Sequence, residues 1–290
     1  MEPVFDLESL LARKRRARRI GDQGAHFLMR RAAEDVADRL STVQRNFTSA
    51  ASVLSQTEAA QTMLCRSGKV ADAIRGEADA GLLDGEGLVA AEEILPLEPE
   101  SLDLVVSLYA LQEVNDLPGM LIQIRRALRP DGLFLACLAG AGTLSELREA
   151  LLAAETELYG GASPRVFPFA DVRDMGGLLQ RAGFALPVTD SESVTVRYDS
   201  MFALIRDLRA MGATNSLLAR SRKPANKALF LRAAEIYAER FSDLDGRVRA
   251  TFSTIWLSGG APHASQQKPL KRGSATVSLA KVLGAEPDEN

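Results

Sequence analysis

Two short apolar runs stand on either side of a helical pattern near the middle of the chain. Residues 102–108 (LDLVVSL) are almost all apolar and rich in valine, which is typical of a strand buried on both faces of a parallel sheet. Apolar residues then recur at helical spacing over 120–128, and residues 129–132 (RPDG) predict a turn into a second apolar strand at 133–138. This order predicts the right-handed crossover of a doubly wound α/β sheet.

The C-terminal third predicts a strand pair that is interrupted by helices. Residues 193–198 (SVTVRY) alternate as an edge strand does, and residues 250–257 (ATFSTIWL) supply its antiparallel partner. Helical stretches at 200–211 and 225–241 lie between them. We therefore expect a Rossmann-like α/β sheet with a helical insertion between the last two strands, over the end of the sheet where ligands bind.

Other elements are expected around this unit. Thr143 and Glu146 lie three residues apart, which predicts a capping box at the start of a helix over 143–158. Further helices are expected over residues 26–40 and 171–182, and a strand over residues 70–74.

The first third of the chain lacks the residues with which such folds bind nucleotides. No glycine occurs between Gly24 and Gly68, where a glycine-rich loop is expected. Glycine in such loops allows positive backbone φ angles and lets the main chain approach the ligand. The pattern therefore predicts an enzyme fold whose cofactor site has been altered.

Composition excludes several classes of protein. The 290 residues carry a net charge of -3 and give no general attraction to nucleic acid. No apolar run reaches the roughly 20 residues of a membrane span, and the first residues lack the apolar segment of a secretory signal. The two cysteines, Cys65 and Cys137, fit a reducing compartment and, with only two histidines, argue against a zinc site. These features favour the cytoplasm of a bacterium.

The chain divides into three parts by composition. Residues 1–22 form a charged arm, interpreted as a solvated helix face or alternatively as a clamp for an anionic partner. Residues 23–262 form the domain, with the insertion at about 199–245, and residues 263–290 form a polar tail. The basic residues of the arm cluster at Lys14, Arg15, Arg16, Arg18 and Arg19.

Several ungapped segments resemble one protein family. These segments are 142–148 (GTLSELR), 160–165 (GGASPR), 178–184 (LLQRAGF) and 272–278 (RGSATVS). Through them the chain resembles, from about Phe5 to Ser278, the methyltransferase-fold complex I assembly factor, known in mitochondria as an arginine hydroxylase, and its bacterial BioC-like methyltransferase relatives.

The resemblance implies a seven-stranded class I methyltransferase fold. In that fold an acidic residue, a glycine loop and a helix hold S-adenosylmethionine after the first strand. Aligned on residues 45–47 (RNF), the acidic position is Ser52, and the three loop glycines become Leu54, Gln56 and Glu58. A second acidic position falls on Ala91, with Glu92 and Glu93 beside it.

These replacements predict lost or severely weakened binding of S-adenosylmethionine. Each added Cβ costs about 1–2 kcal/mol, and each lost hydrogen bond to a ligand hydroxyl costs about 0.5–1.5 kcal/mol. Four such losses convert micromolar into roughly millimolar affinity. Two alternatives stay open: a slipped alignment, or a site rebuilt around Glu92, Tyr109 and Gln112. Tyr109 is equally explained as a core residue with its hydroxyl in water.

Three functions are compatible with this resemblance. The first is an assembly factor that binds a respiratory complex I subunit or another protein without transferase chemistry. The second is a protein arginine hydroxylase, although a nonhaem iron site usually needs two histidines and a carboxylate, and His26 and His263 lie in terminal segments. The third is an active, BioC-like methyltransferase that uses S-adenosylmethionine.

Partner-binding residues are expected in the segment that matches the family best. Arg148, Glu155 and Arg165 lie there, and Arg148 and Glu155 also suit a solvated ion pair along one helix face. We predict that Arg148 or Arg165 meets an acidic partner. Arg272 either holds the C-terminal tail to the domain or contacts a ligand, and the sequence is compatible with both roles.

Overall fold

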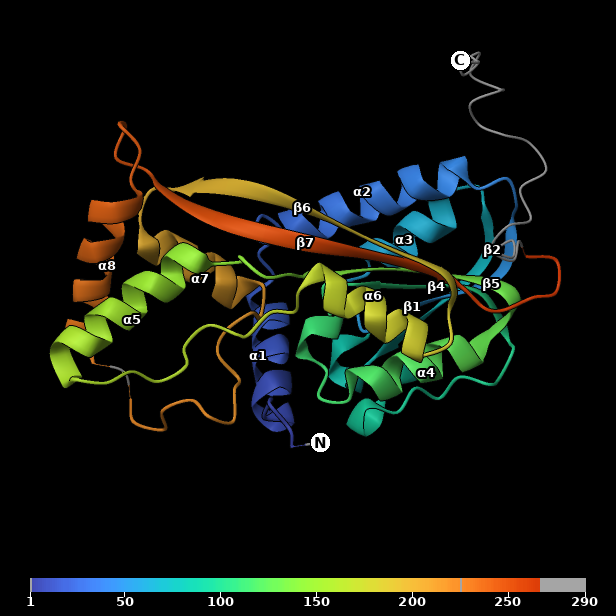
Figure 1. The fold of residues 1–290 in the computed structure, drawn as a ribbon, viewed down its shortest axis with the longest axis horizontal. Helices are drawn as coiled ribbons and strands as arrows, with labels where there is room; N and C mark the ends of the chain where they lie inside the picture. Colours follow the sequence, from blue (N-terminus) through green and yellow to red (C-terminus); the bar gives the residue numbers. More distant parts are fainter. Residues whose placement is uncertain (1, 225, 267–290) are drawn as a thin grey trace, which may run out of the picture.

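A single seven-stranded sheet forms the centre of the protein (Figure 1). The computed structural model describes residues 2–224 and 226–266. The strand order is β3-β2-β1-β4-β5-β7-β6; the first five strands are parallel, and β7 runs antiparallel to β5 and β6. This confirms the predicted seven-stranded class. The strands are β1 (Phe47–Val53), β2 (Val70–Glu77), β3 (Leu88–Val89), β4 (Leu102–Leu108), β5 (Leu128–Ala139), β6 (Ala185–Tyr198) and β7 (Val248–Gly260).

Helices cover both faces of the sheet (Figure 1). α2 (Phe27–Thr42) and α3 (Ala59–Arg66) pack on one face, where Leu40, Leu64 and Leu104 belong to one buried cluster. α4 (Leu117–Ala127) and α6 (Val172–Arg181) cover the opposite face. Because helices bury β4 on both faces of the sheet, nearly all of its residues are apolar. Three-residue 3-10 helices lie at Ala80–Leu82, Ala91–Glu93 and Leu111–Glu113.

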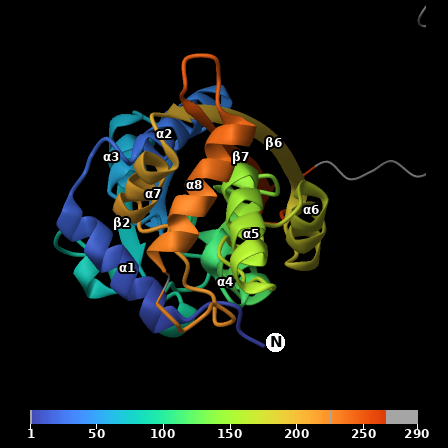
Figure 2. The ribbon, with the colours of Figure 1, turned by 90° about the vertical axis from the view of Figure 1, so that its left-hand side faces the viewer.

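The long β6–β7 pair carries the insertion beyond the sheet. α7 (Met201–Ala210) and α8 (Lys227–Phe241) lie between these two strands in sequence, and α8 packs against α5 (Ser145–Tyr159). Figure 2 shows α5, α7 and α8 side by side at this end of the molecule. Their apolar faces form a separate buried cluster with the near ends of β6 and β7.

α1 (Leu7–Ile20) lies against the rest of the domain, beside α7 (Figure 2). Asp6 caps its first turn, and Gly21 ends it at a φ of 64°, a left-handed conformation that favours glycine. Leu10, Lys14 and Ala17 are buried on its inner side. A helix with this stripe of small and apolar positions packs on a surface rather than standing free in solvent.

Two local expectations are wrong. β5 begins at Leu128, not at residue 133, because Leu128 pairs with Leu102 across a register shift. The capping box at α5 does not form either, since Thr143 exchanges hydrogen bonds with the main chain of Ser253 and Glu146 accepts from Thr251 N. Both side chains tie α5 to β7 instead.

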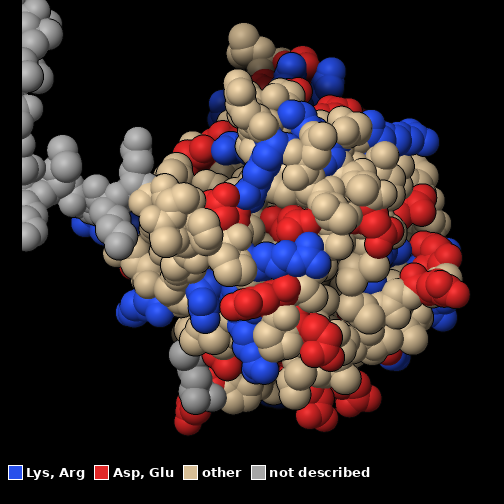
Figure 3. Space-filling model, turned by 90° about the vertical axis from the view of Figure 1, so that its right-hand side faces the viewer, with Lys and Arg blue, Asp and Glu red and all other residues tan. Residues whose placement is uncertain are grey.

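Acidic and basic side chains are interspersed on the face shown in Figure 3. Across residues 2–224 and 226–266, no helix combines the length and apolarity that a bilayer crossing requires. The tail signature at 272–278, including Arg272, lies outside the described residues.

Candidate functional site

The loop after β1 keeps the backbone shape of a glycine loop without its glycines. β1 ends at Val53, and Leu54 and Gln56 adopt φ angles of 59° and 58°. Each such residue bears about 1–2 kcal/mol of strain because its Cβ crowds the carbonyl oxygen. This conformation persists because Leu54 is only 7% exposed and packs in the core cluster that includes Ala90 and Ala110.

The other altered positions are also occupied by contacts within the protein. Ser52 is fully buried and its hydroxyl donates to Ser55. The amide of Gln56 donates to the carbonyl of Met211 after α7, so it joins the loop to the insertion. Glu58 is exposed at the start of α3 and makes no capping hydrogen bond. The polar groups of Ser52 and Gln56 are therefore committed to contacts within the protein, whereas Glu58 faces solvent.

A buried ion pair lies beside this loop at the end of β2. Arg75 and Glu77 are 3% and 1% exposed, and the Arg75 Nη2 and Glu77 Oε1 atoms are 3.1 Å apart. Arg75 also donates to the carbonyl oxygens of Gln56 and Leu82. Burial raises the pKa of Glu77, while the cations of Arg75 and Lys14 oppose that shift. The guanidinium thus holds the loop and a buried carboxylate together.

A second buried ion pair joins α1 to the 3-10 helix Leu111–Glu113, which follows β4. The Lys14 ammonium lies 2.7 Å from a carboxylate oxygen of Glu113, and the two residues are 7% and 6% exposed. Lys14 follows Leu10 by one helical turn, so a charged residue occupies the apolar stripe of α1. This contact fixes α1 across the carboxyl ends of the parallel strands.

Little space remains where S-adenosylmethionine is normally held. Between α1 and the ends of β1, β2 and β4, a cavity of about 60 Å³ is bounded by Leu10, Lys14, Leu54, Ala78 and Glu113, among others. Sites for molecules of this size have volumes of about 300–1,000 Å³. The cavity is too small by a factor of about five at least, so the residues present do not fit the cofactor in its usual position.

The three residues predicted for a rebuilt site do not come together. Glu92 is exposed and borders the small cavity near α1. Tyr109 and Gln112 instead line a separate, larger chamber. The Tyr109 hydroxyl shares a hydrogen bond with Thr254, and burial raises its pKa. The Gln112 amide donates to the carbonyl of Tyr109.

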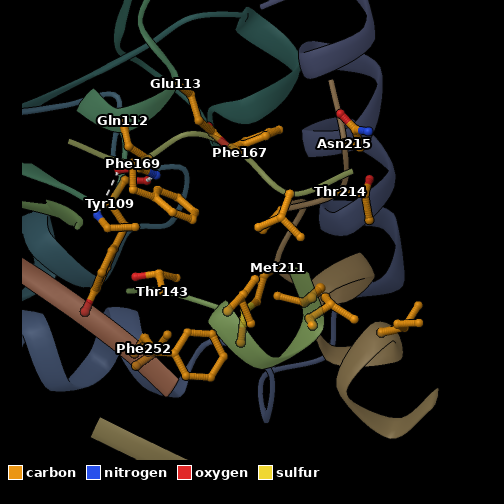
Figure 4. A pocket seen from close by; sticks show the side chains of 18 of the residues that line it. Tyr109, Gln112, Glu113, Thr143, Phe167, Phe169, Met211, Thr214, Asn215 and Phe252 are labelled. Carbon is orange, nitrogen blue, oxygen red and sulfur yellow. Dashed lines mark hydrogen bonds between the residues drawn. The ribbon is translucent and has the colours of Figure 1, made fainter. Parts of the chain in front are cut away.

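This larger chamber, of about 370 Å³, lies at the carboxyl ends of β4 and β5 beneath the insertion (Figure 4). Gln112, Phe169 and Tyr109 form one side of it, and Thr214 and Asn215 lie across from them. Most of its wall is apolar; α2, α5, α7, α8 and β7 contribute to it, together with the segments 165–169 and 211–215. Sheets of this class bind ligands at this edge, so the chamber is a candidate ligand site.

The predicted partner residues have two different environments. Glu155 is buried and accepts two hydrogen bonds from Arg165, at 2.7 and 3.1 Å, and two from Ser163. Burial alone raises the pKa of Glu155, but these hydrogen bonds outweigh it and hold the pKa below its ordinary value. Arg148 is exposed and donates to the carbonyl of Phe167, not to Glu155. Arg165 is therefore committed internally, whereas Arg148 faces solvent.

The two histidines lie in different parts of the fold. His26 precedes α2 and lines the chamber, where burial lowers its pKa. His263 is exposed after β7 and contacts Ser265. Among residues 2–224 and 226–266, no group of three or more His, Cys, Asp or Glu side chains gathers as a metal site does.

Sequence reasoning missed the two buried ion pairs, although each leaves a signal. Arg75 and Glu77 are two residues apart in a strand, and residues at that spacing share one face of a sheet. Lys14 stands at an inward position of the α1 stripe. A charge at a predicted core position usually requires an opposite charge nearby. Glu113 has no such signal, because its partner is about a hundred residues away in sequence.

Comparison with known proteins gives consistent relatives. Residues 51–136 match the family model described as a methyltransferase domain. The chain is 45% identical over 194 residues to the mitochondrial arginine-hydroxylase NDUFAF5 of Dictyostelium discoideum, which covers 67% of this chain and 44% of that protein. It is 38% identical over 187 residues to the malonyl-[acyl-carrier protein] O-methyltransferase of Laribacter hongkongensis, covering 64% and 60%. The chain therefore spans about half the length of the curated relatives it matches.

A solved structure shows the same fold. A Bacillus halodurans protein classed with the methyltransferases superposes with a TM-score of 0.54 at 13% identity, over 79% of this chain and 98% of that one. At such low identity the likeness extends to the fold alone.

The expected bacterial cytoplasm is corrected by these relatives. Proteins 45% and 44% identical to this chain, from Dictyostelium discoideum and Homo sapiens, are mitochondrial, whereas the bacterial relatives are less similar. The expectation was wrong because composition and free cysteines do not distinguish one reducing compartment from another.

Proposed function

This chain belongs to the class I methyltransferase-fold family of the arginine-hydroxylases NDUFAF5 and their O-methyltransferase relatives, and from that premise we propose a partner-binding role without S-adenosylmethionine. The observation that supports this proposal is that side chains fill the edge of the sheet where the cofactor is normally held. Leu54, the Arg75–Glu77 pair and the Lys14–Glu113 pair occupy it. A cofactor in its usual position would compete with these side chains for space, because only about 60 Å³ is open there.

Simple energetics give the size of this effect. Separating one buried ion pair costs about 3–5 kcal/mol, because it leaves uncompensated charges in the interior. Every 1.4 kcal/mol weakens binding about tenfold, so opening even one pair reduces a micromolar affinity to roughly the millimolar range. Cofactor-dependent methyl transfer is not expected at such affinity.

Calorimetric titration with S-adenosylmethionine and S-adenosylhomocysteine tests the proposal. We expect no saturable heat at micromolar concentrations, and no cofactor released when the purified full chain is denatured and analysed by mass spectrometry. A methyltransferase with an intact glycine loop is the positive control. Saturable micromolar binding of either compound would refute the loss of the cofactor site.

The partner-binding part of the proposal rests on Arg148. Its side chain is exposed and borders a surface groove with Val4, Leu152 and Leu218, three exposed apolar residues. A cation beside apolar side chains suits a protein segment with an acidic residue. Complex I assembly is the role that the family resemblance implies, so we propose a respiratory complex I subunit as the partner.

Affinity capture compares Arg148→Ala with Arg181→Ala, a matched control in which an exposed arginine of α6 is removed. We expect Arg148→Ala to lower the amount of complex I subunits captured by several-fold, and Arg181→Ala to leave it unchanged. Equal capture by both variants and the wild-type chain would show that Arg148 does not meet the partner.

The arginine hydroxylase that the relatives' names describe is less well supported here. The chamber is bordered by Arg13 and by Thr214, the residue to which Arg16 donates. Cations at this position repel a guanidinium substrate. Detection of a hydroxylated arginine on a captured partner by mass spectrometry would favour that alternative.

A further inference from the structure

Two arginines of α1 lack carboxylate partners near the chamber: Arg13 lines it, and Arg16 contacts one of its lining residues. Arg13 lines the chamber and donates to the carbonyl of Ser9 at 3.0 Å. Arg16 donates to the hydroxyl of Thr214 at 3.2 Å, and Thr214 also lines the chamber. Within the described ranges, neither guanidinium lies within 4.0 Å of an acidic oxygen. The Arg16 Nε atom is buried and has no hydrogen-bond partner there.

The surroundings of these arginines are positive. Burial and the neighbouring cations of Arg220 and Arg16 lower the pKa of Arg13, and Asp6 only partly opposes them. Burial and the cations of Arg209 and Arg19 lower the pKa of Arg16. Asp6 is already engaged by Arg220 at 2.8 Å and by Arg222 at 3.4 Å. Glu113, the acidic residue that lines the chamber, is paired with Lys14 at 2.7 Å. An anion placed at this rim would therefore relieve like-charge repulsion.

The interior behind the rim has the opposite character. Leu147 and Leu151 of α5, Ile205 and Leu208 of α7 and Phe230 of α8 line it. Its volume of about 370 Å³ lies within the range of small-molecule sites. Each CH2 group of a ligand that is buried against an apolar wall contributes about 0.8 kcal/mol to the free energy of binding.

We propose that this chamber binds an amphiphile with one anionic head, a carboxylate or a phosphate, against Arg13 and Arg16, with its apolar chain among α5, α7 and α8. The site needs no cofactor. It shares a wall with the groove beside Arg148, but Arg13 lines only the chamber and Arg148 lines only the groove. The proposal therefore goes beyond partner binding and does not depend on it.

Titration of the full chain with decanoate, decyl phosphate and decanol, below their aggregation concentrations, tests the proposal. Decanoate or decyl phosphate is expected to bind saturably, and the tighter of the two identifies the head group. Decanol, acetate and inorganic phosphate are expected to bind at least tenfold more weakly, because each lacks the head or the chain. Each CH2 added from hexanoate to decanoate should tighten binding about three- to fourfold.

The variants Arg13→Gln and Arg13→Gln/Arg16→Gln are compared with Arg181→Gln, which removes the same charge from α6. Affinity for the anionic amphiphile should fall about tenfold in the first and further in the second, while the control retains it. Absence of saturable binding, or equal binding of decanol and decanoate to the wild-type chain, would overturn the proposal. The comparison of ligands on the wild-type chain decides the question even if a variant does not fold.

Discussion

Replacing Arg75 with alanine is expected to lower the free energy of unfolding by about 3–5 kcal/mol. Arg75 is the cation that compensates Glu77 in the interior of the sheet, and it also satisfies the carbonyl oxygens of Gln56 and Leu82. Its removal leaves a buried carboxylate and two acceptors without their donor. A loss of this size is a large fraction of the stability of an ordinary domain.

The loss should depend on pH with a defined sign. Burial already raises the pKa of Glu77 above its ordinary value of 4.5, and Arg75 opposes this shift. Without Arg75 the folded-state pKa rises further. The contribution of Glu77 to the stability of the variant is then largest below pH 4.5 and is lost as the pH rises through the folded-state pKa, because the unfolded chain ionises first.

Urea denaturation of the wild-type and Arg75→Ala chains at pH 5 and pH 8 measures both effects. Arg129→Ala is the matched control, since Arg129 pairs with Asp103 while 42% of its side chain is exposed. An exposed pair contributes about 0–1 kcal/mol. A loss below about 1 kcal/mol in Arg75→Ala, or a loss that is larger at pH 5 than at pH 8, would contradict the assigned role.

Replacing Lys14 with methionine is expected to destabilise the domain by about 3 kcal/mol and to loosen α1. Methionine keeps the length and apolar stem of the side chain but leaves the Glu113 carboxylate buried and unpaired. We expect the lower end of the usual range because Glu113 also borders the larger chamber. Water there stabilises a charge that has lost its partner.

A double-mutant cycle separates the ion pair from simple packing. Lys14→Met/Glu113→Gln removes both charges and should recover most of the stability lost in Lys14→Met. Arg15→Met is the control on the same helix, because Arg15 pairs with Asp79 at an exposed position. Thermal unfolding and amide hydrogen exchange of α1 are the measurements. Additive losses in the double variant would show that Lys14 and Glu113 act independently.

Local sequence patterns determined most of the fold. The apolar run at 102–108 is β4, since a strand buried on both faces must be apolar throughout. The alternating run at 193–198 lies within the edge strand β6 and pairs with β7 as expected. Helical spacing likewise located α4, α7 and α8 to within a few residues.

Local patterns did not predict the hydrogen-bond partners of side chains that have several possible partners. Thr143 and Glu146 match a capping box, yet both bind residues of β7 more than a hundred positions away. Nothing in the local pattern ranks a nearby hydrogen bond against a distant one. The pairing of Glu155 with Arg165 instead of Arg148 has the same origin, since the loop after α5 returns Arg165 to that carboxylate.

The sequence by itself determined the crossover from β4 to β5, the antiparallel pair of β6 and β7 and the absence of loop glycines, because each follows from residue type and spacing along a short segment. Only the tertiary structure decided what fills the cofactor edge. Leu54, Arg75, Lys14 and Glu113 come from four separate segments, and their compensation of charge and volume exists only once α1 lies across the strand ends. A charged side chain at the surface is solvated by water, whereas a buried one requires an oppositely charged partner. Which side chains are buried is decided by the whole fold.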